Sequence, residues 1–97
     1  MKVFISQPMR GKTREQIVSE RAAVVAELKE QGHEEFDSFV TESTPPDGNV
    51  SLWYLGKSFQ KLAEADAVYF MDGWQDARGC VMEHEAASRY GVQIIHD

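Results

Sequence analysis

The sequence predicts a single α/β domain built on a small, mainly parallel sheet, and three observations lead to this class. The chain has 97 residues, enough for one hydrophobic core but not for two. Short apolar runs alternate with segments of helical periodicity, in the order strand, helix, strand, helix, strand, helix, strand. Right-handed crossovers between such units give a doubly wound, three-layer sandwich with four strands and three main helices over residues 1–97.

The first third of the chain gives a strand and a helix. Residues 3–5 form a β-branched and aromatic run typical of a buried strand. Thr13 and Gln16 form a capping box for a helix that Gly32 stops. The apolar face that this helix is expected to bury consists of Ile17, Val18, Ala22, Val25 and Leu28.

The middle of the chain carries weaker signals. A short strand near an edge is expected within residues 36–40, and a Pro- and Gly-containing loop over residues 41–49. A second helix, capped by Asn49 or Ser51, follows this loop. Its expected apolar face consists of Leu52, Leu55, Phe59, Leu62 and Ala63, whereas Trp53 and Tyr54 point elsewhere, toward a partner or a cleft.

The last third begins with residues 67–71, the clearest buried strand, and a loop over residues 72–76 follows at its carboxyl end. A third helix opens at Gly79 and ends at Gly91. Met82, Ala86 and Tyr90 lie at helical spacing within it, and residues 92–95 form the final strand.

Charge and cysteine content narrow the function classes. The net charge of −6, from 16 acidic and 10 basic residues, argues against general binding to nucleic acid or to an anionic membrane. A small phosphorylated ligand stays compatible, because it needs only a local pocket. The single cysteine, Cys80, excludes an internal disulfide and indicates a reducing compartment. The first apolar run is far shorter than the ~7–15 residues of a signal peptide, so we expect a cytoplasmic protein.

Ligands of doubly wound sheets bind beyond the carboxyl ends of the strands, which singles out two loops, residues 6–12 and 72–79. Both loops lead into helix N-termini, whose free N–H groups favour anions. The first loop ends like a P-loop, but Ser6 stands at the motif's first glycine and Pro8 removes one N–H group. We expect this loop to form a pocket floor, in which Ser6, Arg10 and Gly11 face a phosphate or a sugar hydroxyl; a plain polar connection is the alternative.

Glu83 lies in the first turn or two of the third helix, where the helix dipole favours its ionised form. An ionised carboxylate facing a pocket can act as a nucleophile toward an electrophilic sugar carbon. Glutamates near helix starts more often only stabilise the helix.

Several other side chains near these loops allow either a structural or a functional interpretation. Cys80 and His84 share a helix face and suggest a thiolate with a histidine base or the start of a metal site, but no third ligand is evident. We expect a buried, inert cysteine, a solvated histidine and no metal or cofactor. Trp74 is either a lid on the third helix or a wall on which a base stacks. Asp72 and Asp76 are either turn formers or a proton donor to a leaving base.

Residues 3–11 read Val-Phe-Ile-Ser-Gln-Pro-Met-Arg-Gly, and Asp-Ala-Val-Tyr at 66–69 is followed by Gly-Trp at 73–74 and Gly-Cys-Val-Met-Glu at 79–83, with Ala87 four residues on. Together these stretches resemble the nucleoside 2-deoxyribosyltransferase-like superfamily, which includes the deoxynucleoside monophosphate N-glycosidases and small, often phage-borne members.

The resemblance implies a flavodoxin-like parallel sheet and a homodimer or larger assembly in which a neighbouring subunit completes the site. It implies that the Glu83 carboxylate attacks an anomeric carbon through an oxocarbenium-like transition state, after which water or a second base releases the sugar. The catalytic candidates are Glu83, Asp72 and Asp76. The substrate-binding candidates are Ser6, Gln7, Pro8, Met9, Arg10, Gly11, Trp74 and Gly79.

The leading hypothesis is therefore an N-glycosidic hydrolase or deoxyribosyl transferase that acts on a small nucleoside or nucleotide. The alternative is a non-catalytic module that binds a nucleotide or a ribosylated signal. Two departures from the family pattern favour it, because Ala77 replaces an Asp or Ser and Ser58 replaces an expected aspartate. A third hypothesis is a structural or partner-binding protein with Trp53 and Trp74 at its interface.

Overall fold

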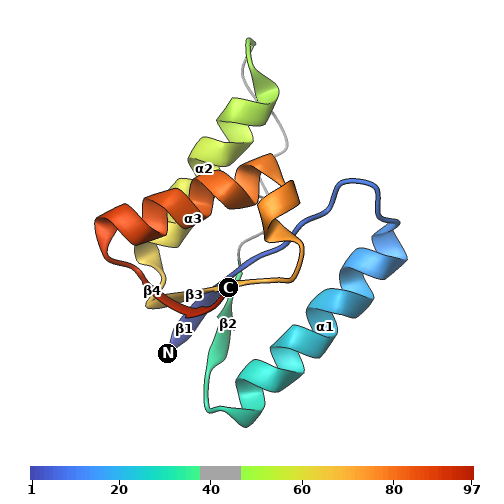
Figure 1. The fold of residues 1–97 in the computed structure, drawn as a ribbon, viewed down its shortest axis with the longest axis vertical. Coiled ribbons are helices and arrows are strands. Elements are labelled where there is room, and N and C mark those ends of the chain that lie inside the picture. Colours follow the sequence, from blue (N-terminus) through green and yellow to red (C-terminus); the bar gives the residue numbers. More distant parts are fainter. Residues whose placement is uncertain (38–46) are drawn as a thin grey trace.

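In the computed structural model of the chain, which describes residues 1–37 and 47–97, four strands form one parallel sheet (Figure 1). The spatial order is β2-β1-β3-β4. Helix α1 covers one face of the sheet, and α2 and α3 cover the other (Figure 1). The predicted flavodoxin-like, three-layer α/β class is confirmed. The elements are β1 (Lys2–Ser6), α1 (Arg14–Glu30), β2 (Glu34–Phe36), α2 (Val50–Glu64), β3 (Ala67–Phe70), a 3-10 turn (Trp74–Asp76), α3 (Arg78–Tyr90) and β4 (Gln93–His96).

The two central strands place the candidate site. β1 pairs with β2 on one side and with β3 on the other, so the chain reverses its direction of travel across the sheet between β1 and β3. Val3 lies opposite Ala67, and Ser6 lies opposite Phe70. This register brings the carboxyl ends of β1 and β3 level, and the crevice of a doubly wound sheet opens at this point.

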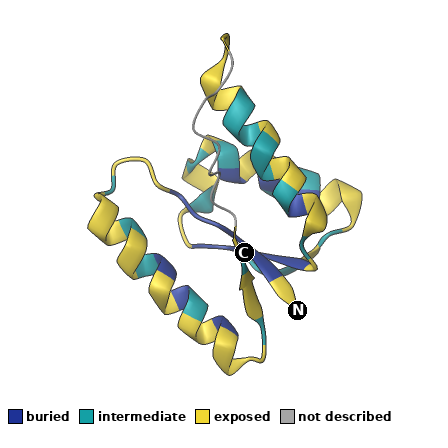
Figure 2. Ribbon diagram, turned by 180° about the vertical axis from the view of Figure 1, so that it is seen from behind, coloured by how far each residue is buried: buried dark blue, intermediate teal, exposed yellow. Residues whose placement is uncertain are grey.

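The core has two halves, one on each face of the sheet, because successive strand side chains point to opposite faces. Figure 2 shows the continuous burial of β1 and β3 between the helices. On the α1 side the buried cluster consists of Val3, Ile5, Val24, Leu28, Ala67, Tyr69 and Met71. On the α2 and α3 side it consists of Phe4, Leu62, Val68, Phe70 and Ala87.

Local sequence signals determine the helix ends. The Thr13 hydroxyl accepts a hydrogen bond from the Gln16 backbone N–H at 3.1 Å, and the Gln16 side chain accepts one from the Thr13 N–H at 2.8 Å. The predicted capping box is therefore confirmed. Asn49 caps α2 by accepting from the Leu52 N–H at 2.9 Å. Gly91 ends α3 at a positive φ of 74°, which favours glycine.

Some predicted boundaries differ from the structure. The edge strand β2 begins at Glu34, two residues before the predicted start, and it ends at Phe36. The predicted continuation of this strand over residues 38–40 and most of the loop over residues 41–49 lie outside the described residues. Helix α3 begins at Arg78, one residue before the predicted Gly79.

The predicted buried face of α1 was right at Leu28, which is buried, and at Val25, which packs against the core, but wrong at Val18 and Ala22. Val18 is 59% exposed and Ala22 is also exposed, whereas Val24, which was not predicted, is buried. The reason is Arg21, a charged residue that lies at the centre of the buried face with 6% exposure. Its guanidinium group is paired at that place, so the helix can turn a charged position inward.

The predicted apolar stripes of α2 and α3 also differ from the buried ones. On α3 the buried residues are Cys80, Glu83 and Ala87, whereas Met82 is 47% exposed and Tyr90 is 86% exposed. On α2, Leu62 is the buried residue of the predicted set, and Leu52 is 61% exposed. The face of α3 that is buried contains the carboxyl group of Glu83. A prediction based on the spacing of apolar residues cannot identify such a face.

The corrected α1 face gives a direct test. Leu28→Ala removes a side chain that is 1% exposed, and we expect a loss of about 3 kcal/mol in the free energy of unfolding. Val18→Ala, on the same helix but 59% exposed, should change it by no more than about 0.5 kcal/mol. Urea unfolding followed by circular dichroism measures both. Equal losses in the two variants would contradict the assignment of the buried face.

Candidate functional site

A cavity of about 420 Å³ opens at the carboxyl ends of β1 and β3, between the β1–α1 loop and the N-terminal end of α3. It is the site that the sheet topology favours, since both loops named from the sequence contribute to it. The described residues that line it are Phe4, Ile5, Ser6, Gln7, Met9, Arg10, Ser58, Asp76, Ala77, Arg78, Gly79, Cys80 and Glu83.

The Glu83 carboxyl group lies in the wall of this cavity and is 7% exposed. It accepts a hydrogen bond from the Ser6 hydroxyl at 3.2 Å. Burial raises the pKa of Glu83 from its ordinary value of 4.5 to about 7, and the bond from Ser6 only partly opposes this shift. The expectation that the helix dipole keeps Glu83 ionised is therefore wrong in part, because desolvation outweighs the favourable local field. Near neutral pH the carboxyl group exchanges readily between its two protonation states.

Ser6 is the last residue of β1, and the backbone holds it firmly. It is 2% exposed, it lies opposite Phe70 in the sheet, and its carbonyl oxygen accepts from the Met71 N–H at 3.0 Å. The strand pairing fixes the backbone of Ser6, and its hydroxyl links the Glu83 carboxyl group to the end of β1.

Gln7 and Arg21 brace the loop that follows β1. The Gln7 amide nitrogen donates to the Ile17 carbonyl oxygen at 2.8 Å, and the Arg21 guanidinium donates to the Gln7 amide oxygen at 3.4 Å. The Arg21 guanidinium also donates to the Glu35 carboxylate at 3.0 Å. Arg21 was not among the predicted site residues, although a charged residue within an apolar helix face was the available signal.

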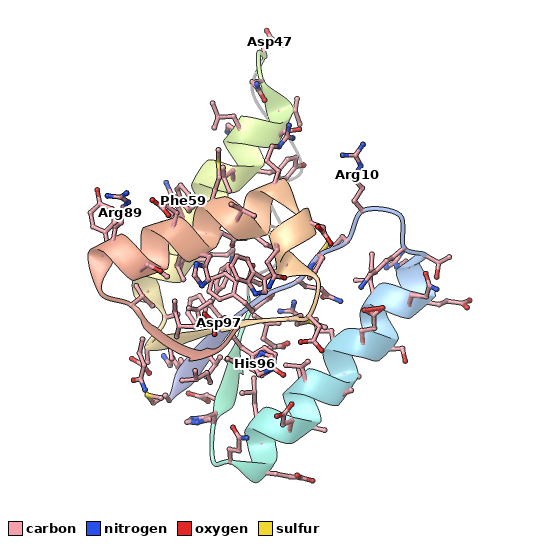
Figure 3. All side chains as sticks on the ribbon, in the orientation of Figure 1. Arg10, Asp47, Phe59, Arg89, His96 and Asp97 are labelled. Carbon is pink, nitrogen blue, oxygen red and sulfur yellow. The ribbon has the colours of Figure 1, made fainter. Side chains whose placement is uncertain are left out.

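Positive charge lies on both sides of the cavity. Arg10 extends outward from the β1–α1 loop (Figure 3), and Arg78 occupies the first position of α3. Ala77, the N-cap residue of α3, has no side-chain group with which to cap the helix. The first backbone N–H groups of α3 therefore add partial positive charge at the end of α3 that borders the cavity.

The structure brings most of the predicted site residues together, but not all. Ser6, Gln7, Met9, Arg10, Asp76, Gly79 and Glu83 line the cavity. The lining, taken over the described residues, does not include the predicted Pro8, Gly11, Asp72 or Trp74.

Trp74 packs away from the cavity. Its ring stacks on His84 with centroids 4.1 Å apart and contacts Phe70 at 5.5 Å, so the expectation that it forms a cavity wall was wrong. The contact with His84 agrees with the alternative interpretation, in which Trp74 packs on the third helix as a lid. The aromatic character of Trp74 alone does not predict whether its ring faces the cavity or α3.

Cys80 and His84 do not act as a pair in this fold. Cys80 is 4% exposed, and burial raises the pKa of its thiol, which disfavours a thiolate. His84 stacks on Trp74 and its Nε2 lies 3.0 Å from the Asp97 carboxylate, so it is more enclosed than the solvated residue that was expected. Over residues 1–37 and 47–97, no group of three His, Cys, Asp or Glu side chains is placed to hold a metal ion.

Six cavity residues were not named as ligand contacts from the sequence, and two of them, Phe4 and Ile5, belong to β1. Ser58 approaches from α2, and Ala77, Arg78 and Cys80 come from the start of α3. Ala77 and Ser58 are the positions at which the chain departs from the resembled family pattern, and both line the cavity.

The fold and this cavity define a small flavodoxin-like domain with a crevice at the strand-order reversal. Over residues 1–96 the chain matches the family model described as Domain of unknown function (DUF4406), and it belongs to this family. No curated protein and no solved structure shows a significant match to the chain. None of the helices in the described ranges is long and apolar enough to cross a membrane.

The raised pKa of Glu83 has a consequence for stability. Between pH 4.5 and about 7 the folded chain holds more protons at this carboxyl than the unfolded chain, so its contribution to the free energy of unfolding falls as pH rises. We expect Glu83→Gln to gain about 3 kcal/mol relative to the unmodified protein across this window. Urea unfolding at a series of pH values measures the difference.

Glu85→Gln is the matched control, because Glu85 lies on the same helix with a largely exposed carboxylate. Glu85→Gln also removes the exposed ion pair with Arg89, so its unfolding free energy should lie at most about 0.5 kcal/mol below that of the unmodified protein, without the rise relative to it that is expected for Glu83→Gln. Parallel curves for Glu83→Gln and the unmodified protein would show that Glu83 titrates at its ordinary pKa.

Proposed function

We propose that the protein cleaves or transfers the N-glycosidic bond of a small nucleoside or nucleotide, with Glu83 as the nucleophile. The observation that carries the proposal is the buried Glu83 carboxyl, bonded to Ser6 and facing a cavity of about 420 Å³ at the strand-order reversal. The resemblance of the ligand loop and the Gly79-to-Glu83 segment to the nucleoside 2-deoxyribosyltransferase-like superfamily supports it.

The proposed reaction uses two carboxyl groups of the cavity. The ionised Glu83 carboxylate forms a bond to the anomeric carbon while the bond from this carbon to the base breaks. The electron pair of the broken bond leaves with the base, and Asp76, which lines the same cavity, donates a proton to it. A water molecule then attacks the anomeric carbon of the glycosyl ester and gives a proton to the Asp76 carboxylate, while the bond from this carbon to Glu83 breaks and restores the Glu83 carboxylate. A second base in place of water gives transfer.

The basic groups suit a substrate with a negative charge. Arg10, Arg78 and the uncapped start of α3 border the cavity of a chain whose net charge is −6. Local positive charge in an acidic protein favours a small anion over a polyanion. The Ser6 and Ser58 hydroxyls can bond to sugar hydroxyls. In this proposal the protein acts in the cytoplasm as a homo-oligomer.

Base release tests the proposal. Incubation with a panel of 2-deoxynucleosides and their 5′-monophosphates should release free base from at least one member, as measured by chromatography. Glu83→Gln removes the nucleophile while preserving shape, and it should lower kcat at least about 1000-fold. Glu85→Gln, exposed on the same helix, should retain the rate. Equal rates in both variants would exclude Glu83 as the nucleophile.

The pH profile distinguishes the role of Glu83. A nucleophile must be ionised, so kcat/KM should rise about tenfold per pH unit below the Glu83 pKa of about 7 and level off above it. A general acid must be protonated, so its profile would fall above the same pH. Initial rates from pH 5 to pH 9 at low substrate concentration measure the profile.

A second candidate function is binding without chemistry. It is favoured by Ala77, whose methyl group lines the cavity where the resembled family carries an Asp or Ser, and by Ser58 in place of an aspartate. In that case a nucleotide should raise the melting temperature without any base release, because a ligand of the folded state adds to its stability. The same panel, followed by thermal unfolding, separates the two functions.

A further inference from the structure

Arg21 is a charged residue buried on the inner face of α1, and the proposed chemistry does not use it. Its side chain is 6% exposed, and it does not belong to the described lining of the cavity. Burial of a guanidinium group costs free energy unless hydrogen bonds and an opposite charge compensate for it. Gln7 and Glu35 supply such contacts. An apolar side chain would fill this helix position without that cost, so the contacts of Arg21 point to a role beyond packing.

The amide group of Gln7 is held at both ends. Its nitrogen donates to the Ile17 carbonyl oxygen at 2.8 Å, and its oxygen accepts from the Arg21 guanidinium at 3.4 Å. Both partners belong to α1, so these bonds direct the amide toward this helix, and Gln7 is 8% exposed. The Gln7 side chain therefore connects the wall of the cavity to α1.

The loop that follows Gln7 is exposed where it borders the cavity. Met9, Arg10 and Gly11 are exposed, and the Lys12 N–H donates to the Met9 carbonyl oxygen at 3.2 Å to close a turn. Figure 1 shows this loop leaving the end of β1 and reaching the start of α1. Exposed turns with little packed surface open readily. The place of Met9 and Arg10 at the cavity therefore depends on how firmly Gln7 anchors the loop.

The shape of the guanidinium group explains why an arginine suits position 21. The planar group presents several N–H donors in fixed directions, so one side chain can bond to two partners at once. Its Nε donates to the Glu35 carboxylate on β2 at 3.0 Å, while a terminal nitrogen donates to Gln7. A lysine ammonium can neutralise Glu35 but does not reproduce this two-sided geometry. Substitution by lysine therefore separates the charge of Arg21 from its hold on Gln7.

We propose that Arg21 is a positioning residue, which acts through Gln7 to hold the exposed part of the β1–α1 loop at the place where substrate binds. Its effect on substrate binding rests on the proposed function, whereas its effect on the loop does not. Ser6 is held separately, by its pairing with β3. Loss of the Arg21 contact should therefore loosen the loop and weaken binding, and it should leave the chemistry at Glu83 intact.

Nitrogen-15 NMR relaxation tests the effect on the loop without any substrate. In the unmodified protein the N–H groups of residues 9–11 should have order parameters near the roughly 0.85 of rigid backbone. Arg21→Lys should lower them below about 0.6, the range of flexible backbone, and Gln7→Met should do the same. Glu35→Gln is the matched control, because it removes the charge beside Arg21 but keeps a hydrogen-bond acceptor. The loop should stay rigid in this variant.

Steady-state kinetics test the consequence for the substrate. With a 2-deoxynucleotide that the unmodified protein cleaves, Arg21→Lys should raise KM about tenfold and change kcat less than about twofold, because binding is weakened while Glu83 keeps its place. The pH profile should keep its midpoint. The double variant Arg21→Lys with Gln7→Met should be no worse than either single variant, because the two residues act as one unit. If no base is released, dissociation constants from calorimetry replace KM.

Three results would overturn the inference. The first is a loop that is flexible in the unmodified protein, or that stays rigid in folded Arg21→Lys and Gln7→Met. The second is an equal loss of order in Glu35→Gln, which would make Arg21 a structural ion pair only. The third is a KM that rises about a hundredfold in the double variant, which would show that the two residues act separately.

The two proposals fail in different ways. A protein that releases no base contradicts the proposed glycosidic chemistry, and the relaxation data still decide the role of Arg21. Circular dichroism verifies that each variant is folded. Gln7→Met keeps the test decisive if Arg21→Lys does not fold, because it removes the same contact without disturbing the pair between Arg21 and Glu35.

Discussion

The hydrogen bond between Ser6 and Glu83 joins the carboxyl end of β1 to the first turns of α3, across 77 residues of sequence. It is made in a nearly water-free position, with Ser6 2% exposed and Glu83 7% exposed. A carboxyl group in such a place is costly to ionise, and the Ser6 hydroxyl offsets only part of that cost. The contact joins two of the elements that border the cavity, and it opposes part of the desolvation that raises the pKa of Glu83.

The surrounding structure explains how so small a domain can hold a buried acid. The sheet is fully parallel, and its two central strands are buried on both faces. Arg21, paired with Gln7 and Glu35, braces the loop after β1 from the α1 side. The opposite wall is the start of α3, where Ala77 leaves the backbone N–H groups without a side-chain cap. A buried acid and partial positive charge therefore meet in one crevice.

The sequence predicted the order of the elements, the capping box at Thr13 and the two loops that form the cavity, because these follow from local periodicity and from the topology of doubly wound sheets. The sequence did not predict correctly which faces of the helices are buried. Arg21 and Glu83 are charged residues at buried positions, and only tertiary partners make such burial possible. Trp74 was misplaced for a related reason, since its stacking partner His84 becomes a neighbour only after α3 packs. The apolar stripe of Met82 and Tyr90 was correctly recognised as a stripe but not as an exposed one.

The most direct test of the buried-acid arrangement is a carbon-13 NMR titration of the Glu83 side-chain carboxyl carbon, assigned by comparison with Glu83→Gln. The carboxyl should titrate with a midpoint near pH 7, and the midpoint should move higher in Ser6→Ala, because the hydrogen bond that favours the charged form is lost. A midpoint near pH 4.5 that does not respond to Ser6→Ala would show a solvated carboxylate and would contradict the arrangement on which the proposed chemistry depends.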